Sequence, residues 1–388
     1  MARSTSIYFF AGDFVDVLSR YACGHQQIYA THDEVARLIR DLREADVRLT
    51  IYSFVTQKAG DERPIEGVRI VSLGSANYAT TDLIGSAVGA DDSETIIVHF
   101  ANIELLRAVA RTNKRAMAVL ANSYNRKGLK PYLERRRVTS LLNNPRFELV
   151  SNHCLPATEH LAHIGVQRQK LIAWDVPHRF DPSGTAPKTF RNGTHYQIAY
   201  AGSINEDKGV GDLIHAVARL REHGIELHCS FGGTGNIQQM QALGASLGIS
   251  ELLSFRGLIG NDDVFQMFCS ADLVTVPSRA LYPEGFPLTM FEAIASRTPI
   301  VCSDHPMFRP VMKDGTNASV FRAGDAAAMA DAIRRLLADG LLYETLSKNA
   351  PQTWDALRGP ADWRTLMSKW VLEGPDSSWI RAQMLNPA

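Results

Sequence analysis

The chain has 388 residues, which at roughly 100–200 residues per domain favours two domains over one large core. Its 45% apolar and 21% charged residues are typical of a globular protein and exclude disordered and collagen-like chains. The 41 basic and 41 acidic side chains cancel, so the net charge indicates no partner.

The first predicted element is a strand at Ile7–Phe10. This apolar run is too short for the core of a secretory signal, and Asp13 and Asp16 follow it closely. No apolar stretch reaches the roughly 18 residues of a transmembrane helix. The five cysteines are scattered and form no C-x-x-C pair, which indicates a reducing compartment without disulfides or a zinc site. We therefore expect a cytoplasmic protein, with a peripheral position on the inner face of the membrane as a further hypothesis.

The first half of the chain alternates apolar β-rich runs with segments of helical period, such as Asp33–Ala45 and Ile103–Thr112. This alternation predicts an α/β domain with a parallel sheet covered on both faces. The predicted strands after Ile7–Phe10 are Val47–Phe54, Val68–Leu73, Thr95–Phe100, Ala116–Ala121 and Phe147–Ser151.

A strongly basic segment, Arg107–Arg146, interrupts this pattern. It carries eleven Lys or Arg against the single acid Glu134, a charge of +10 over 40 residues. One interpretation is a solvated helical face, and the other is a surface for anionic lipid headgroups or a phosphorylated acceptor. Nucleic acid is disfavoured, because only Tyr124 and Tyr132 are interleaved with the charges and no recognition motif accompanies them.

Between Trp174 and Gly193 the alternation of strands and helices is interrupted by a segment rich in Pro and turn-forming residues, which predicts an interdomain linker. The alternation restarts after it. The sequence therefore predicts two consecutive doubly wound domains, one on each side of this linker. Ligands in such sheets bind beyond the carboxyl ends of the strands. In the second half we predict helices at Gly211–His223, Ile237–Leu247, Asp262–Ser270, Leu288–Ser296, Ala326–Ala338 and Ala361–Leu372. The strands between them are Gln197–Ala201, Glu226–Phe231, Leu252–Arg256, Leu273–Pro277 and Ile300–Cys302.

The strongest chemical signal lies between the predicted strand Leu273–Pro277 and the predicted helix Leu288–Ser296. Pro287 stands where the helix begins, and the free N–H groups of Leu288 and Thr289 suit a phosphate. Glu284 and Glu292 lie at the same mouth, where carboxylates can accept hydrogen bonds from sugar hydroxyls. The strand, Gly/Pro loop and helix around this glutamate pair are what make it specific.

A second signal is the glycine-rich turn Tyr200–Gly209, which ends in Lys208-Gly209. Such a turn between a strand and a helix can bring an ammonium and backbone amides to phosphate oxygens. Taken alone, it could equally be an ordinary turn with a solvated lysine. It matches neither Walker A nor G-x-G-x-x-G, which counts against P-loop and dinucleotide sites.

Together these residues resemble the donor-binding half of the retaining glycosyltransferases of family 4, which have the GT-B fold. The hallmark of that family, Glu, seven residues, Glu, is matched by Glu284–Glu292. Its companion motifs are matched as well, over nearly all of residues 145–372. They are Gly202 with Lys208-Gly209, Phe231–Gly235, Phe255–Gly257, Val276–Ser278 and Thr298–Val301.

The resemblance implies two Rossmann-like doubly wound domains facing a cleft and a C-terminal helix that crosses back to the first domain. We expect an acceptor-side domain at residues 1–185, a donor domain at 186–358 and the returning helix within 359–388.

The resemblance also implies roles for residues on the donor side. Glu292 would bind the ribose hydroxyls, Glu284 the hexose, and Lys208 the diphosphate, with Glu284, Lys208 and Asn122 as the catalytic candidates. The substrate would be a UDP- or GDP-sugar, with no cofactor and no metal ion. The remaining donor-binding candidates are Gly202, Ser203, Leu258, Gly285, Phe286, Pro287, Leu288 and Thr289.

The first domain departs from the family pattern. Asn122 or Ser123 stands where the family commonly places a histidine, and an Asn side chain cannot titrate. Gly24 and His25 replace a Gly-Gly loop, and we take both as acceptor-side candidates together with His99 and Ser123. His99 could equally be a structural histidine at the end of a strand.

Three functional hypotheses follow. The first is a retaining hexosyltransferase acting on a glycan, glycolipid or polysaccharide-precursor acceptor, with the basic segment on an anionic membrane surface. The second is a binding or scaffolding subunit that kept the donor fold and lost turnover, for which Ser203 and the lost histidine are the motivation. The third, a sugar-nucleotide epimerase, fits the glutamate motif poorly.

Overall fold

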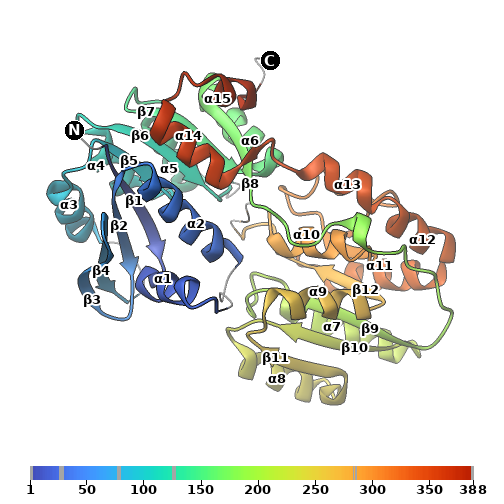
Figure 1. Cartoon of the computed structure of the whole chain (residues 1–388). Helices are drawn as coiled ribbons and strands as arrows, with labels where there is room; N and C mark the ends of the chain where they lie inside the picture. The colour runs from blue at the N-terminus through green and yellow to red at the C-terminus, as the bar shows by residue number, and fades with distance from the viewer. Residues whose placement is uncertain are drawn as a thin grey trace. The chain divides into compact units, whose positions relative to one another are not determined.

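The computed structural model describes residues 3–25, 30–76, 80–124, 128–282, 284 and 286–385. The chain divides into two compact units, drawn in Figure 1: a first unit of Met1–Pro177 with Gly359–Ala388, and a second unit of His178–Arg358. The residues from His178 to Thr185 therefore lie with the second unit. The His178 ring stacks on Phe291, with 4.4 Å between ring centroids, which holds the start of this segment there.

The first unit is built on a nine-stranded sheet in the order β15-β8-β7-β6-β5-β1-β2-β4-β3. Neighbouring strands are parallel except β3 and β4, which form an antiparallel pair at one edge. The strands are β1 (Ser4–Ala11), β2 (Arg48–Val55), β3 (Ala59–Ile65), β4 (Val68–Ser75), β5 (Thr95–Val98), β6 (Arg115–Leu120), β7 (Phe147–His153), β8 (Leu171–Asp175) and β15 (Ala361–Asp362).

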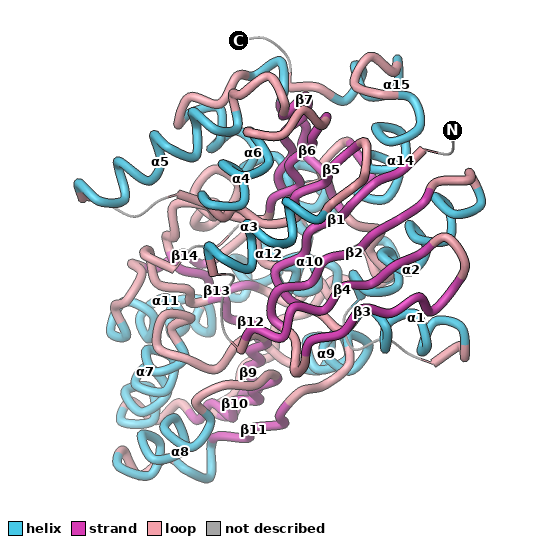
Figure 2. The backbone as a smooth tube through the Cα atoms, turned by 90° about the vertical axis from the view of Figure 1, so that its left-hand side faces the viewer, coloured by secondary structure: helices cyan, strands magenta, loops and turns pink. Residues whose placement is uncertain are grey.

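Helices cover both faces of this sheet, as Figure 2 shows. Successive residues of a strand point to opposite faces, so Ile7 joins the apolar core on one side and Tyr8 the core on the other. The first core is closed by α1 (Phe14–Ala22), α2 (Ala30–Glu44), α14 (Trp363–Glu373) and α15 (Ser378–Gln383). The second is closed by α3 (Thr81–Ala90), α4 (Ile103–Ala110), α5 (Leu129–Leu142) and α6 (Cys154–His163).

The chain returns to the first unit at its C-terminal end, as the sequence predicts. Arg364 on α14 forms ion pairs with two acids on α2, at 3.2 Å to Glu34 and 2.8 Å to Asp41. Strand β15 extends the sheet by pairing with β8.

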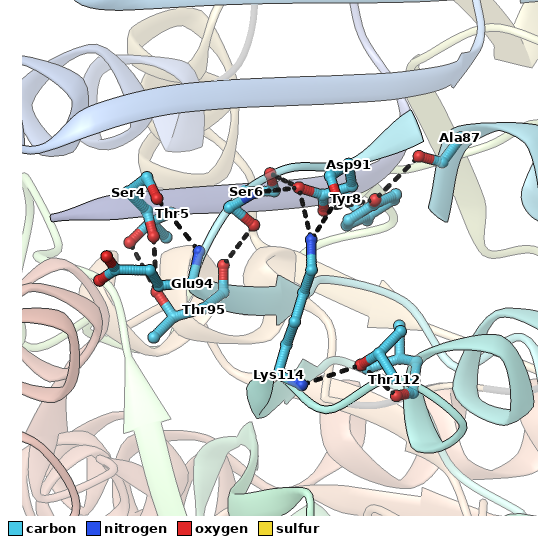
Figure 3. A network of polar contacts seen from close by, with 12 residues as sticks. Ser4, Thr5, Ser6, Tyr8, Ala87, Asp91, Glu94, Thr95, Thr112 and Lys114 are labelled. Atoms are coloured by element: carbon cyan, nitrogen blue, oxygen red, sulfur yellow. Dashed lines mark hydrogen bonds and ion pairs between the residues drawn. The ribbon is translucent and has the colours of Figure 1, made fainter. Parts of the chain in front are cut away.

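A buried polar network lies on the opposite face of this sheet. The buried Asp91 accepts hydrogen bonds from Ser6 and Tyr8 and pairs with Lys114 at 3.1 Å (Figure 3).

The second unit has a six-stranded parallel sheet in the order β11-β10-β9-β12-β13-β14. Its strands are β9 (His195–Ala201), β10 (Glu226–Gly232), β11 (Leu253–Gly257), β12 (Leu273–Val276), β13 (Ile300–Ser303) and β14 (Ser319–Phe321). Its helices are α7 (Val210–Glu222), α8 (Ile237–Ser246), α9 (Asn261–Ser270), α10 (Leu288–Ala295), α11 (Ala326–Ala338), α12 (Gly340–Lys348) and α13 (Ala350–Leu357).

This strand order reverses direction between β9 and β12. In doubly wound sheets such a topological switch point opens a crevice beyond the carboxyl ends of the two strands, where ligands bind. The two segments that follow β9 and β12 are therefore the first place to look for a site. Among the helices of the described residues, none combines the length and apolar character needed to cross a membrane.

Candidate functional site

The segment between β12 and α10 holds a buried carboxylate. The Glu284 side chain is 7% exposed, and its Oε1 accepts a hydrogen bond of 2.6 Å from the Ser278 hydroxyl. Ser278 is fixed in turn, because its carbonyl accepts a 2.7 Å hydrogen bond from Ser303 on β13. Gly285, expected here as a donor-binding residue, lies outside the described residues.

The segment after β9 supplies the partner of this carboxylate. Lys208 Nζ lies 2.5 Å from Glu284 Oε1, and the Lys208 side chain is 14% exposed. The same ammonium lies 4.6 Å from the centroid of the Tyr282 ring, a cation–π distance. An ammonium has three donors, so two remain for another anion. The two residues are 76 positions apart in sequence, and the switch point brings them together.

The second carboxyl, Glu292, is in a different state. It lies half-buried in the first turns of α10, and no side chain of the described residues forms an ion pair with it. Burial raises its pKa from 4.5 to about 8, because an ionised carboxyl loses hydration without gaining a partner. Of the two glutamates, Glu284 is thus the one paired with a cation, and Glu292 has no such partner among the described residues.

Glycine is required where the Lys208 segment meets β12. Gly209 has a φ of +76°, and a Cβ atom there would lie 2.2 Å from the carbonyl oxygen of Pro277. Gly202, with a φ of +146°, donates its N–H to the Gly232 carbonyl. Ser203, the next residue, has an exposed side chain. These glycines let the backbone after β9 lie flush against the neighbouring strand ends.

Arg279, which was not among the predicted site residues, also joins the two segments. Its guanidinium makes a bidentate contact of 2.7 and 2.9 Å with Asp212 on α7 and lies 3.1 Å from Glu206. It thereby ties the start of α7, just after Lys208, to the segment that carries Glu284. The sequence could have indicated Arg279 by its position directly after Ser278 in the predicted loop, because a charged side chain at that place needs an acidic partner.

The start of α10 has an apolar anchor and an open end. Phe286 is buried, and its ring meets those of Phe291 and Phe308 edge-on. Pro287 is the N-cap residue, and no side chain caps the N–H groups that follow, so the terminus at Leu288 and Thr289 is free to bind an anion. Leu258, which follows β11, is 54% exposed.

In the first unit, His99 stands at the carboxyl end of β5. Its Nε2 accepts a 3.0 Å hydrogen bond from Trp363 Nε1 at the start of α14, and its ring packs on Phe9. Burial lowers the pKa of His99 to about 4, so the imidazole is neutral at pH 7. With Nε2 occupied, this histidine positions α14 and is no general acid.

Asn122 and Ser123 follow β6, and Asn152, which was not among the predicted site residues, holds the backbone of Asn122. The Asn152 amide donates to the Asn122 carbonyl at 2.9 Å and accepts from its N–H at 3.2 Å. The Ser123 hydroxyl is buried and has no hydrogen-bond partner among the described residues. Asn152 lies near the carboxyl end of β7, the position at which a polar residue could have been suspected.

Gly24 and His25 end helix α1. Gly24, with a φ of +68°, donates to the Tyr21 carbonyl, and His25 donates to the Arg20 carbonyl, which is the hydrogen-bond pattern of a Schellman cap. Both residues are exposed. The need for glycine at position 24 is thus explained by the helix end. Across the described parts of both units, no three His, Cys, Asp or Glu side chains are placed to hold a metal ion.

Comparison with known proteins gives matches in sequence and in structure. Residues 185–353 match the family model described as glycosyl transferases group 1. The phosphatidyl-myo-inositol mannosyltransferase of Mycobacterium leprae is 30% identical over 148 residues, 38% of this chain and 38% of that protein. The chain thus matches well under half the length of this curated relative.

Two solved structures match nearly the whole chain. The sucrose-phosphate synthase of Thermosynechococcus elongatus has a TM-score of 0.66 at 16% identity, covering 95% of this chain and 98% of that one. Anabaena HepE in complex with UDP-glucose has a TM-score of 0.63 at 15% identity, with the same coverage. At these identities the likeness concerns the fold, and it confirms the predicted GT-B fold.

Proposed function

Because residues 185–353 belong to the glycosyl transferase group 1 family, we propose that this protein is a retaining glycosyltransferase. It moves a hexose from a nucleoside diphosphate sugar to a glycan, a lipid-linked acceptor or a polysaccharide precursor. The observation that supports this best is the division of labour between two glutamates at one switch point. Glu284 is paired with Lys208, whereas Glu292 is open.

On the donor side, each group has one task. The Glu292 carboxyl exchanges hydrogen bonds with the ribose hydroxyls, and Glu284 faces the hydroxyls of the hexose. Lys208 keeps one donor on Glu284 and offers the others to the diphosphate, which makes it the main cation opposite the leaving group. Because the Lys208–Glu284 pair is preformed, the ammonium is positioned before the donor arrives.

Backbone groups complete the donor site. The backbone N–H groups of Phe286, Leu288 and Thr289 contact the sugar and the distal phosphate at the open end of α10, with the Phe286 ring and Pro287 holding that end in place. Gly202 and Ser203 lie beside the diphosphate, and Leu258 contacts the base. UDP is the first nucleotide to test, since Anabaena HepE was solved with UDP-glucose, and GDP is the second.

The reaction exchanges one bond at the anomeric carbon. The bond from that carbon to the diphosphate oxygen breaks, and its electron pair leaves with the nucleoside diphosphate. The acceptor oxygen forms the new bond on the same face, and its proton passes to a diphosphate oxygen, so the configuration is retained. The chain supplies electrostatic stabilisation of the leaving group and needs no titrating base.

The acceptor side belongs to the first unit. Asn122, held by Asn152, offers an amide to a sugar hydroxyl, and the unpartnered hydroxyl of Ser123 is a second polar contact. His99 contributes a neutral imidazole that positions the start of α14 through its hydrogen bond with Trp363. Gly24 and His25, both exposed, are the outermost acceptor contacts.

A panel of UDP- and GDP-sugars tests the proposal by thermal shift and by mass-spectrometric detection of donor cleavage. A bound donor at about 100 times its Kd stabilises the protein by about 2.7 kcal/mol. Glu292→Ala should weaken nucleotide binding, and Glu284→Ala should abolish transfer while the nucleotide still binds. Glu222→Ala, on the exposed face of α7, is the matched control.

Three outcomes would contradict the proposal. Nucleotide binding without cleavage of any sugar would favour the scaffold subunit, which the absent histidine at Asn122 and the uncharged Ser203 motivate. Conversion of the donor to an isomer without acceptor would favour an epimerase. Unchanged turnover in both glutamate variants would mean that the site lies elsewhere.

A further inference from the structure

In the folded protein, some cations of the basic segment Arg107–Arg146 are paired with acids, and others have no acid in contact among the described residues. Three of its cations form ion pairs with acids that lie outside the segment. These pairs are Arg107 with Glu104, Lys114 with the buried Asp91 (Figure 3), and Arg115 with Glu148. The charge of +10 counted along the sequence therefore overstates what the folded surface offers to a partner.

Two further cations bind neutral groups outside α5, and Arg136 donates to the Tyr132 hydroxyl on its own helix at 3.4 Å. Arg135 donates to the carbonyl of Tyr124, and Arg146 donates to the backbone and side chain of Asn113. Arg126 and Lys127 lie outside the described residues. Of the remaining four, three are exposed on α5 without an acid in contact among the described residues: Lys130, Arg136 and Arg137.

Helix α5 also carries the largest group of exposed apolar side chains in the described chain. Leu129 is 75% exposed, Tyr132 45% and Leu133 44%, at the spacing that places them on one face of a helix. The opposite face packs into the unit through Val138 and Leu142. Seven residues of α5 are exposed, and none is acidic: Leu129, Lys130, Tyr132, Leu133, Arg136, Arg137 and Ser140.

Cations and apolar side chains alternate around this face. The guanidinium groups of Arg135 and Arg136 each lie over the Tyr132 ring, 6.0 Å from its centroid, which is a cation–π distance. Figure 2 shows α5 at the periphery of its unit, with no other element of that unit over its outer side. A large apolar group left open in this way marks an interaction surface.

We propose that the exposed face of α5 docks on an anionic lipid bilayer, with Leu129, Tyr132 and Leu133 inserted among the headgroups and Lys130, Arg136 and Arg137 bound to lipid phosphates. A basic helix that interleaves apolar and cationic side chains suits the interface, which offers negative charge and apolar depth together. A soluble polyanion would use the cations and leave the leucines in water. Nucleic acid also lacks stacking partners here, since Tyr132 is the one exposed aromatic of the face.

Docking through α5 would serve the proposed function by bringing the acceptor-side loop to the membrane. Ser123 precedes Leu129 by six residues, a span of at most about 20 Å of chain. A lipid-linked acceptor would then meet the site without leaving the bilayer. The purpose of docking rests on the proposed function, whereas the binding itself does not.

Vesicle flotation with full-length protein and no donor tests the proposal. Vesicles of phosphatidylcholine with about one third phosphatidylglycerol should bind the protein, and pure phosphatidylcholine should not. Arg136→Gln/Arg137→Gln should reduce partitioning about 25-fold, about fivefold for each cation. Leu129→Ser/Leu133→Ser should reduce it about tenfold, because apolar area is lost from the interface.

The matched controls lie on the second unit. Leu341→Ser removes a leucine that is 79% exposed, and Arg334→Gln removes an exposed cation that pairs with Asp331, so neither should change partitioning. Vesicle binding that survives both α5 double variants would overturn the proposal. An equal loss of vesicle binding in the Leu341→Ser control would also overturn it. The same holds if Leu129→Ser/Leu133→Ser binds vesicles like wild type while Arg136→Gln/Arg137→Gln loses binding to both vesicles and single-stranded RNA. UDP-induced thermal shifts, unchanged in every α5 variant, report separately on the donor site.

Discussion

The open carboxyl of Glu292 has a measurable consequence for stability. Burial raises its pKa from 4.5 to about 8, so the folded protein keeps this proton up to about pH 8. The unfolded chain releases the same proton above about pH 4.5. Between these values unfolding releases a proton, and the free energy of unfolding must therefore fall as the pH rises.

The size of the effect follows from the shift. At about 1.4 kcal/mol per pKa unit, the displacement from 4.5 to about 8 corresponds to an upper bound of about 5 kcal/mol. This contribution is fully present below pH 4.5 and is lost by the time the pH has passed about 8. Glu292→Gln replaces the carboxyl by a neutral group of the same shape, so the variant should lack this part of the pH dependence.

Urea unfolding between about pH 5 and pH 9 measures the difference between wild type and Glu292→Gln. The two should be nearly equal at pH 5, and the variant should be the more stable by several kcal/mol at pH 9. Glu222→Gln, at an exposed position of α7, should follow wild type throughout. Parallel curves for wild type and Glu292→Gln would contradict this prediction, because they would mean that this carboxyl is ionised in the folded protein at neutral pH.

Three other predictions concern the same units. Lys208→Met should lower the free energy of unfolding by about 3–5 kcal/mol, because it leaves Glu284 buried without its cation. The double variant Lys208→Met/Glu284→Gln should regain part of this stability, which a double-mutant cycle measures. Gly209→Ala should prevent normal folding or cost more than about 3 kcal/mol, since a Cβ there meets backbone oxygen, whereas Gly248→Ala, with a φ of +69° and open space around it, should cost about 1 kcal/mol. The pKa of His99, lowered to about 4 by burial, means that stability is lost as the pH falls from 6.5 towards 4, by up to about 3 kcal/mol, and an NMR titration of its imidazole should show no protonation at pH 6.

The sequence predicts most of the sheet strands, because a buried parallel strand is a continuous apolar run that few other elements imitate. It misses β8, β14 and β15, and also β3, whose seven residues are exposed or half-buried and so carry no apolar signal. It gives no bounds for α5, which it offers only as a solvated helical face within the basic segment, because the apolar residues of this helix point partly outwards. The returning helix, predicted at Ala361–Leu372, begins at Trp363 and ends at Glu373.

Local patterns of apolar residues, turn residues and helix starts are enough to predict the alternation of strands and helices, the two domains and the polar residues at strand ends that mark a candidate site. The GT-B architecture with its returning helix was implied by the resemblance of the motifs to a known family. Which glutamate is paired and which basic residues are neutralised depend on contacts between elements that lie far apart in the sequence. Lys208 meets Glu284 across 76 residues, and Lys114 meets Asp91 from another element. The charge state and exposure of a side chain depend on neighbours that strand order brings together, and that order is not written in any local stretch of sequence.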